Sequence, residues 1–189
     1  RDSMLTRTLD EHFYYTTRYG SPLAYLRPLE LLAKAGLEDV AGKKIVDFGY
    51  GTVGHLRLLA ELGAEAVGIE VDPLLRALYS HSDDQGRVDG KSGGSIRLLH
   101  GRFPADAGVT RDAGAGADLF LSKNTLKNGY IHPEQKVDPR MLVHLGVSDS
   151  AYVAALYHLL APGRRAMIYN LCPAPNAPRK PYVPWADGR

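Results

Sequence analysis

Residues 44–54 read KIVDFGYGTVG, and residues 68–72 read GIEVD. Each stretch contains a short apolar run that ends in an acidic residue, and a turn rich in glycine follows the first run. A helical pattern of apolar residues separates the two stretches. A chain that alternates strand, glycine turn, helix and strand in this way typically holds an adenosine-containing cofactor at the end of a parallel strand.

The wider pattern predicts an α/β fold with a doubly wound, mostly parallel sheet and helices on both faces. Apolar runs predict five strands, at residues 45–48, 66–70, 96–100, 118–122 and 166–171. Helices are expected to begin at Pro22, Thr52, Pro73 and after Ser148. Pro28 interrupts the first helix and predicts a break near residues 26–27. Residues 82–95 are rich in Gly, Asp and Ser and predict an exposed, mobile loop.

The 189 residues suit one core domain with extensions. We predict an aromatic, helical extension or lid at residues 1–36, a cofactor-binding core at residues 37–172 and a proline-rich segment at residues 173–189. Since the chain begins with Arg1 rather than Met, we expect residues to be missing at one or both ends.

The composition limits which partners and which cellular compartment we expect for the protein. A net charge of +2 without a cluster of Lys and Arg argues against nucleic acid and favours a small-molecule or protein partner. Cys172 is the only cysteine, so no internal disulfide can form. No apolar run approaches the roughly 20 residues that span a bilayer, and we expect a cytoplasmic protein without a membrane partner. The sequence does not predict the oligomeric state.

Two classes of cofactor compete for the glycine turn. A nicotinamide or flavin cofactor would place its pyrophosphate at the helix N-terminus, where backbone N–H groups favour an anion. S-adenosylmethionine has no phosphate and carries a sulfonium and an ammonium group. Asp47 lies two residues before Gly49, where a carboxylate would repel a diphosphate and attract an ammonium. The turn therefore favours S-adenosylmethionine, whereas Glu70 suits the ribose hydroxyls of either cofactor.

On these residues the chain resembles the class I S-adenosylmethionine-dependent methyltransferases. The motifs that carry the resemblance lie, in order, at residues 45–51, 68–72, 117–122 and 159–165. The last of them is a turn with leucine, proline and glycine before the fifth strand. The resemblance implies an enzyme with a Rossmann-like sheet and the cofactor at the carboxyl ends of the strands.

The resemblance also implies roles for individual residues. Asp47, Gly49 and Gly51 would face the methionine moiety of the cofactor. Glu70 would bind the ribose, and Val71 would pack on the adenine. The full set of residues expected to bind the cofactor is Asp47, Gly49, Tyr50, Gly51, Glu70, Val71, Gly101, Arg102, Phe103 and Ser122, with Tyr19 from the N-terminal extension.

Three features depart from the pattern of the family. Arg102 follows the third strand, where many members place an acid that reads the adenine amino group. Nothing after Cys172 predicts the hairpin of two strands that usually completes the sheet. Residues 122–125 read SKNT, and not the Asn/Asp-Pro-Pro-Tyr/Phe of many enzymes that act on DNA bases or protein amides. This departure argues against those acceptors.

Residues 123–147 form a long polar insert after the strand whose end abuts the transferred methyl group in this fold. Asn124 is predicted to orient the acceptor, and His132 to accept a proton from a hydroxyl acceptor. The histidines are too dispersed to favour a metal site. The tyrosines of the N-terminal extension, Tyr19 and Tyr14 first, are expected either to cover the cofactor or to pack on the domain surface.

These features predict S-adenosylmethionine-dependent methyl transfer to an oxygen or nitrogen atom of a small molecule or protein. Two alternatives stay open. An NAD-dependent oxidoreductase shares the glycines but leaves Asp47 unexplained. A catalytically inactive, methyltransferase-like binding protein is favoured by Arg102 and by the missing hairpin.

Overall fold

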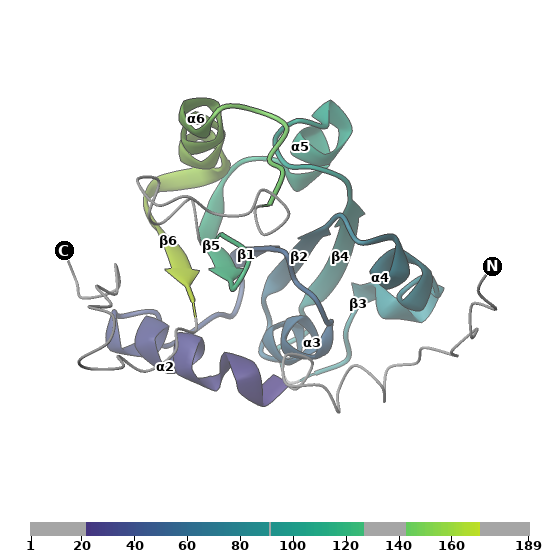
Figure 1. Cartoon of the computed structure of the whole chain (residues 1–189). Helices are drawn as coiled ribbons and strands as arrows, with labels where there is room; N and C mark the ends of the chain where they lie inside the picture. The colour runs from purple at the N-terminus through teal and green to yellow at the C-terminus, as the bar shows by residue number, and fades with distance from the viewer. Residues whose placement is uncertain (1–21, 91, 127–142, 171–189) are drawn as a thin grey trace, which may run out of the picture.

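The computed structural model of the chain describes residues 22–90, 92–126 and 143–170 (Figure 1). A six-stranded sheet has the order β3-β4-β2-β1-β5-β6. Its strands are β1 (Lys44–Phe48), β2 (Glu65–Glu70), β3 (Gly86–Arg87), β4 (Ser95–His100), β5 (Ala117–Lys123) and β6 (Leu160–Tyr169). All neighbouring strands are parallel except β3, which pairs antiparallel with β4 at one edge. The predicted mostly parallel, doubly wound sheet is therefore confirmed.

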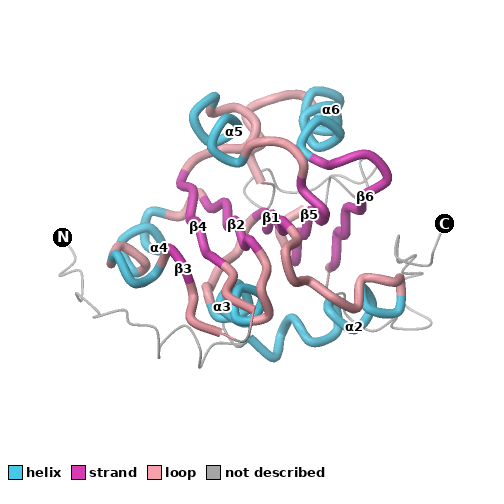
Figure 2. The backbone as a smooth tube through the Cα atoms, turned by 180° about the vertical axis from the view of Figure 1, so that it is seen from behind, coloured by secondary structure: helices cyan, strands magenta, loops and turns pink. Residues whose placement is uncertain are grey.

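Helices cover both faces of the sheet, as the views from the front and from behind show (Figures 1 and 2). One face carries the 3₁₀ helix η1 (Pro22–Tyr25), α2 (Leu26–Lys34), α3 (Gly54–Glu61) and α4 (Pro73–Leu78). The other face carries α5 (Ala107–Ala113) and α6 (Asp149–Leu159). The short 3₁₀ helix η2 (Ser82–Asp84) precedes β3. None of the helices in the described ranges is both long and apolar enough to cross a membrane.

Side chains alternate between the two faces of the sheet along each strand. Ile45 in β1 packs in the core under α2, α3 and α4, and Val46 packs under α5 and α6. In β5, Leu121 lies on the same side as Ile45. Asp47 and Lys123, two residues further along their strands, therefore point toward α2 and α3. The register supports this placement, because Asp47 pairs with Leu121.

The predicted strands and helices form with shifts of a few residues at their ends. Pro28 lies in the first turn of α2, where the N–H that proline lacks would have no partner within the helix. The change from 3₁₀ helix to α-helix falls at residues 25–26, one residue before the predicted break. Ser148 caps α6 as predicted, because its Oγ accepts a hydrogen bond of 3.3 Å from the N–H of Ala151.

Three details differ from the sequence prediction. Residues 82–95 are not a continuous loop, because they contain η2 and the edge strand β3. Residues 161–163 do not precede the last strand but lie within β6, beside a shift in register on β5. The pattern does not predict α5, since Val109 and Ala113 are the only buried side chains in this short helix. The proline-rich segment and the region of the missing hairpin lie outside the described residues.

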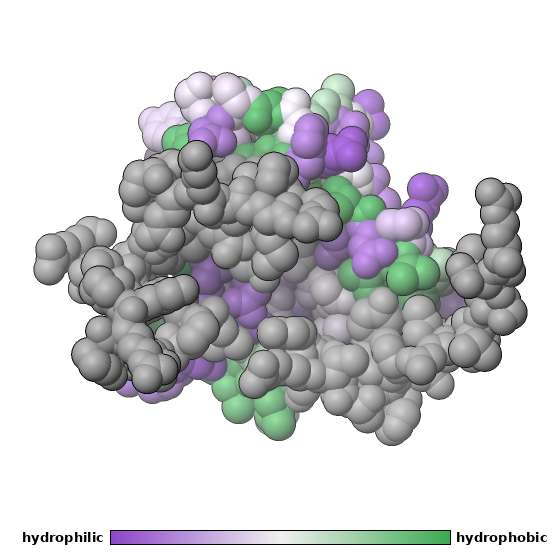
Figure 3. Space-filling model, viewed as in Figure 1, coloured by the Kyte–Doolittle hydropathy of each residue, from purple (hydrophilic) through white to green (hydrophobic). Residues whose placement is uncertain are grey.

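The surface also carries exposed apolar side chains. They occur at η1 and the start of α2, where Leu23 and Leu26 are exposed, and on α4, where Leu74 is exposed (Figure 3). These side chains lie outside the two buried cores. The core that positions the functional residues is the one between the sheet and α2, α3 and α4.

Candidate cofactor-binding site

The glycine turn after β1 is packed against Thr125 at Gly49 and leaves free space beside Gly51. Gly49 and Gly51 have φ angles of +78° and +65°, in the left-handed region that favours glycine. A Cβ on Gly49 would lie 2.2 Å from Oγ1 of Thr125, so Thr125 packs directly on this glycine. A Cβ on Gly51 would meet no atom of the described residues within 4 Å. The backbone at Gly51 is therefore open to close approach by a ligand.

Two cavities meet at this turn, a first of about 210 Å³ and a second of about 290 Å³. Both are lined by Gly49, Asn124 and Thr125. The first is further lined by Phe48, Ile69, Glu70, Val71, Arg102, Phe103, Val143, His144 and Leu145. The second is further lined by Tyr25, Tyr50, Gly51 and Lys123. The first cavity is thus mostly apolar, with the carboxylate of Glu70 in its wall, and the wall of the second contains the side chain of Lys123.

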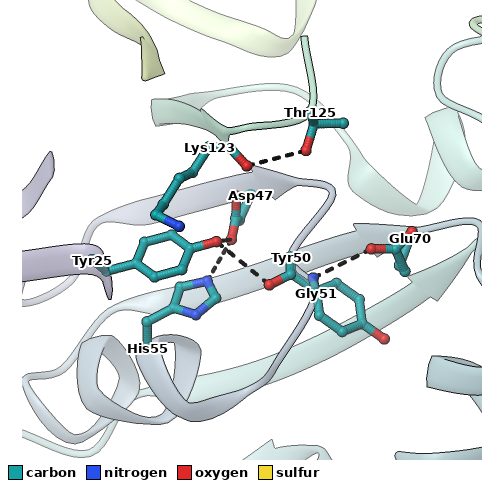
Figure 4. Close-up of polar contacts among 8 residues, drawn as sticks. All are labelled: Tyr25, Asp47, Tyr50, Gly51, His55, Glu70, Lys123 and Thr125. Atoms are coloured by element: carbon teal, nitrogen blue, oxygen red, sulfur yellow. Dashed lines mark hydrogen bonds and ion pairs between the residues drawn. The ribbon is translucent and has the colours of Figure 1, made fainter. Parts of the chain in front are cut away.

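Asp47 is fully buried beneath the turn, where two side chains hold it (Figure 4). Its Oδ2 lies 2.5 Å from Nε2 of His55 and accepts a longer hydrogen bond of 3.4 Å from the hydroxyl of Tyr25. The rings of Tyr25 and His55 stack, with their centroids 3.5 Å apart. Oδ1 of Asp47 is buried and has no hydrogen-bond partner within the described part of the chain.

Lys123, the last residue of β5, lies next to this group. The residue is only 6% exposed, and its Nζ lies 4.9 Å from the centre of the Tyr25 ring, over the face of the ring. The ring therefore lies between the ammonium of Lys123 and the imidazole of His55 (Figure 4). Burial lowers the pKa of Lys123, and the charge of Asp47 opposes this effect. The ammonium forms no ion pair within 4.0 Å with any carboxylate of the described ranges.

Glu70, at the carboxyl end of β2, is fixed on the other side of the turn. Its Oε2 accepts a hydrogen bond of 3.3 Å from the N–H of Gly51 (Figure 4). Its Oε1 accepts hydrogen bonds of 2.8 and 3.2 Å from the N–H groups of Val71 and Asp72. Burial raises the pKa of Glu70, although the three N–H donors favour its charged form. The carboxylate thus has a fixed position in the wall of the first cavity.

The raised pKa of Glu70 predicts how this residue affects stability as the pH changes. The folded state holds the proton of Glu70 more tightly than the unfolded state, so this carboxyl stabilises the fold at low pH and loses that contribution as the pH rises through its folded-state pKa. We expect the free energy of unfolding of the wild type, relative to Glu70→Gln, to fall as the pH rises above the ordinary pKa of a glutamate, about 4.3. Urea denaturation at several pH values measures it. A difference that grows with pH would contradict this prediction.

Most of the residues predicted to bind the cofactor surround the two cavities, as does Asn124, which is predicted to orient the acceptor. Glu70, Val71, Arg102 and Phe103 line the first cavity, Tyr50 and Gly51 line the second, and Gly49 and Asn124 line both. Asp47, Gly101 and Ser122 are not among the lining residues. Tyr19 and His132 lie outside the described residues. The individual roles of all these residues therefore stay predictions.

An acid does lie near the third predicted strand, although Arg102 stands at the position usual for one. Oδ2 of Asp106 accepts a hydrogen bond of 2.6 Å from the backbone N–H of Arg102. The same oxygen would lie 2.5 Å from a Cβ on Gly101, whose φ is +145°. The loop after β4 thus folds back so that a carboxylate four residues away reaches Arg102.

The sequence pattern did not indicate four residues that build this site, namely Tyr25, His55, Lys123 and Thr125. The alternation along β5 contains a signal for Lys123, because this residue has the same parity as the buried Leu119 and Leu121. Thr125 carries no such signal, since its contact with Gly49 arises only when β1 and β5 lie side by side.

The sheet order and the glycine turn define an α/β domain of the doubly wound, Rossmann-like class. No family model matches the chain. It is 31% identical over 107 residues to ribosomal RNA small subunit methyltransferase H of Sinorhizobium medicae, and 26% identical over 101 residues to the protein of the same name from Sinorhizobium fredii. The two matches cover 52% and 53% of this chain. They cover only 30% and 28% of those relatives, so the chain spans less than a third of their length.

Among solved structures, the chain is similar to a TehB-like SAM-dependent methyltransferase from Corynebacterium glutamicum. The two are 18% identical, with a TM-score of 0.40, and the match covers 78% of this chain and 71% of that one. The two curated relatives are methyltransferases, so they confirm the resemblance that the sequence motifs indicated.

Proposed function

We propose that the chain binds S-adenosylmethionine across the two cavities and transfers its methyl group to an acceptor. The observation that carries this proposal is the junction of the two cavities at the glycine turn, with the fixed carboxylate of Glu70 in the first. A ligand that joins an adenosine to an amino acid suits two such compartments separated by bare backbone. The two curated relatives, which are named as methyltransferases, support the same function.

The residues present suit the chemical groups of this ligand. Glu70 offers carboxylate oxygens that accept hydrogen bonds from ribose hydroxyls. Val71 is 56% exposed and offers an apolar surface at the first cavity for the adenine. Gly51 leaves space beside the backbone. Oδ1 of Asp47 is a buried oxygen without a hydrogen-bond partner among the described residues, and the charge of Asp47 beside the turn favours a cationic ligand over an anionic one.

When bound, S-adenosylmethionine supplies a methyl group on a positively charged sulfonium. The protein contributes positioning and the exclusion of water. Asn124 lies where the two cavities meet, with a φ of +58° that only Gly, Asn and Asp adopt readily. Asn124 is therefore proposed to orient the acceptor. His132 is proposed to take the proton of a hydroxyl acceptor.

Titration calorimetry with S-adenosylmethionine, S-adenosylhomocysteine and NAD tests this function. We expect the first two to bind and NAD not to bind, because Asp47 would repel a pyrophosphate beside the turn. Binding of NAD alone would instead support the NAD-dependent oxidoreductase. Failure of all three ligands to bind would support the inactive, methyltransferase-like protein. Either result would remove the proposed function.

The acceptor is proposed on separate grounds. The small net charge of +2 favours a small-molecule or protein acceptor. The names of the two curated relatives favour ribosomal RNA. A lysate incubated with the protein and tritium-labelled S-adenosylmethionine, then separated into RNA, protein and small molecules, distinguishes these acceptors. Label in the RNA fraction would overturn the preference that comes from charge.

Substitutions at Asn124 separate its side chain from its backbone conformation. Asn124→Gly keeps a residue suited to a positive φ, so we expect near wild-type stability but a fall of about tenfold or more in kcat, because the acceptor is no longer oriented. Asn124→Ala should lose the same activity and also about 1–2 kcal/mol of stability. Steady-state kinetics and urea denaturation measure both. Full activity in the glycine variant would exclude the proposed role of the amide.

A further inference from the structure

The buried ammonium of Lys123 lines the second cavity, and its partners in the described structure do not fully compensate its charge. Lys123 is 6% exposed and is one of the residues lining this cavity. A buried ammonium needs an opposite charge or hydrogen-bond acceptors, because burial removes its hydration. The face of the Tyr25 ring, 4.9 Å from Nζ, supplies only a weak electrostatic partner.

Asp47 does not fill this need. Its Oδ2 is already occupied by His55 and Tyr25, and it forms no ion pair within 4.0 Å with Lys123. The three N–H donors of the ammonium therefore have room in the cavity for the oxygens of an anion.

We infer that Lys123 binds the carboxylate group at the amino-acid end of the cofactor. The inference rests on the proposed function and adds a cofactor-binding residue to it. S-adenosylmethionine has one negative group, the carboxylate of its methionine part, and a lysine would repel its sulfonium and ammonium groups. The carboxylate is thus the only charged group of this ligand that Lys123 attracts.

The arrangement of charges on the sheet matches an α-amino acid, which carries an ammonium and a carboxylate on one carbon. Asp47 in β1 and Lys123 in β5 come from neighbouring parallel strands and point to the same side (Figure 4). They offer opposite charges beside the same turn. The ring of Tyr25 stacks on His55 and lies between His55 and the ammonium of Lys123, so the ammonium stays on the side of the cavity.

Two ligands test the inference: S-adenosylhomocysteine and its decarboxylated analogue, which keeps the amino group. We expect wild-type protein to bind S-adenosylhomocysteine about tenfold or more tightly than the analogue, the usual effect of a charge-assisted hydrogen bond. Lys123→Met should bind the two ligands equally, through loss of affinity for S-adenosylhomocysteine alone. Lys123→Arg should keep the preference. Lys44→Met, which removes a lysine at the opposite end of β1, is the control and should also keep it.

Titration calorimetry measures all the affinities, and circular dichroism verifies that each variant folds. Equal binding of the two ligands to wild-type protein, or an equal loss of both in Lys123→Met, would overturn the inference while the proposed function stands. Wild-type protein that binds neither ligand would overturn both. Should Lys123→Met not fold, Lys123→Gln takes its place, because glutamine also removes the charge but keeps a polar end at the cavity. It should likewise lose the preference for S-adenosylhomocysteine, and a preference kept in Lys123→Gln would overturn the inference.

Discussion

Replacing His55 with leucine is expected to lower the free energy of unfolding by about 3–5 kcal/mol, the usual cost of leaving a buried charge without its partner. Asp47 and His55 are 0% and 1% exposed, and 2.5 Å separates the carboxylate oxygen from the imidazole nitrogen. Without the imidazole, the hydrogen bond of 3.4 Å from Tyr25 is the only one left to the carboxylate from the described residues. The leucine side chain provides no donor, so the desolvation of Asp47 is no longer offset.

A double-mutant cycle separates this electrostatic cost from a change in packing. Asp47→Asn removes the charge, so His55→Leu should cost much less in that background than in the wild type. Urea denaturation of the wild type, both single variants and the double variant supplies the four free energies. If His55→Leu costs the same in both backgrounds, packing and not charge holds this part of the core together.

The contacts among Asp47, His55 and Tyr25 explain why the sequence pattern predicted the glycine turn but not the residues that surround Asp47. The strand, the glycines and the following helix depend on neighbours in the sequence, so periodicity and glycine conformation predict them. The partner of Asp47 is a histidine in the first turn of α3, and the stacked Tyr25 comes from a separate helix on the same face. A polar residue in an amphipathic helix is usually assigned to the solvent-facing side. Only the tertiary contact with Asp47 makes the burial of His55 favourable.

The same reasoning applies to the edges of the sheet. Gly86 and Arg87 are both exposed, so no apolar pattern reveals β3, which is defined by its backbone pairing with β4. Pro162 and Gly163 favour a turn by composition, and Gly163 has a φ of +76°. The two residues lie between Leu160 and Arg165, where the register against β5 shifts and neither of them has a β5 partner. At β3 the hydrogen bonds to a neighbouring strand therefore decide the conformation, whereas at residues 162–163 the local preference persists as an irregularity within the strand.

Gly49→Ala is the second substitution with a large expected effect, and it tests how the turn is held. An alanine would adopt a φ of +78°, at a cost of about 1–2 kcal/mol. Its Cβ would also lie 2.2 Å from Oγ1 and 3.0 Å from Cβ of Thr125, so no rotation of the threonine relieves the overlap. Overpacking of this kind adds about 1–3 kcal/mol. Urea denaturation should therefore show a total loss of about 2–5 kcal/mol.

Gly51→Ala is the matched control, because its φ of +65° imposes a similar strain but its Cβ meets no atom within 4 Å in the part of the chain that the structure describes. It should lose only the smaller, conformational part of the stability. The double variant Gly49→Ala with Thr125→Gly removes the overlap. In the Thr125→Gly background, Gly49→Ala should therefore cost only the conformational part of the unfolding free energy.

Gly51→Ala also tests binding. The Cβ at residue 51 enters the space assigned to the ligand, so calorimetry should show weaker binding of S-adenosylhomocysteine although the fold is nearly intact. If Gly49→Ala proves no less stable than Gly51→Ala, Thr125 does not pack on the turn in the way that the 2.2 Å distance requires.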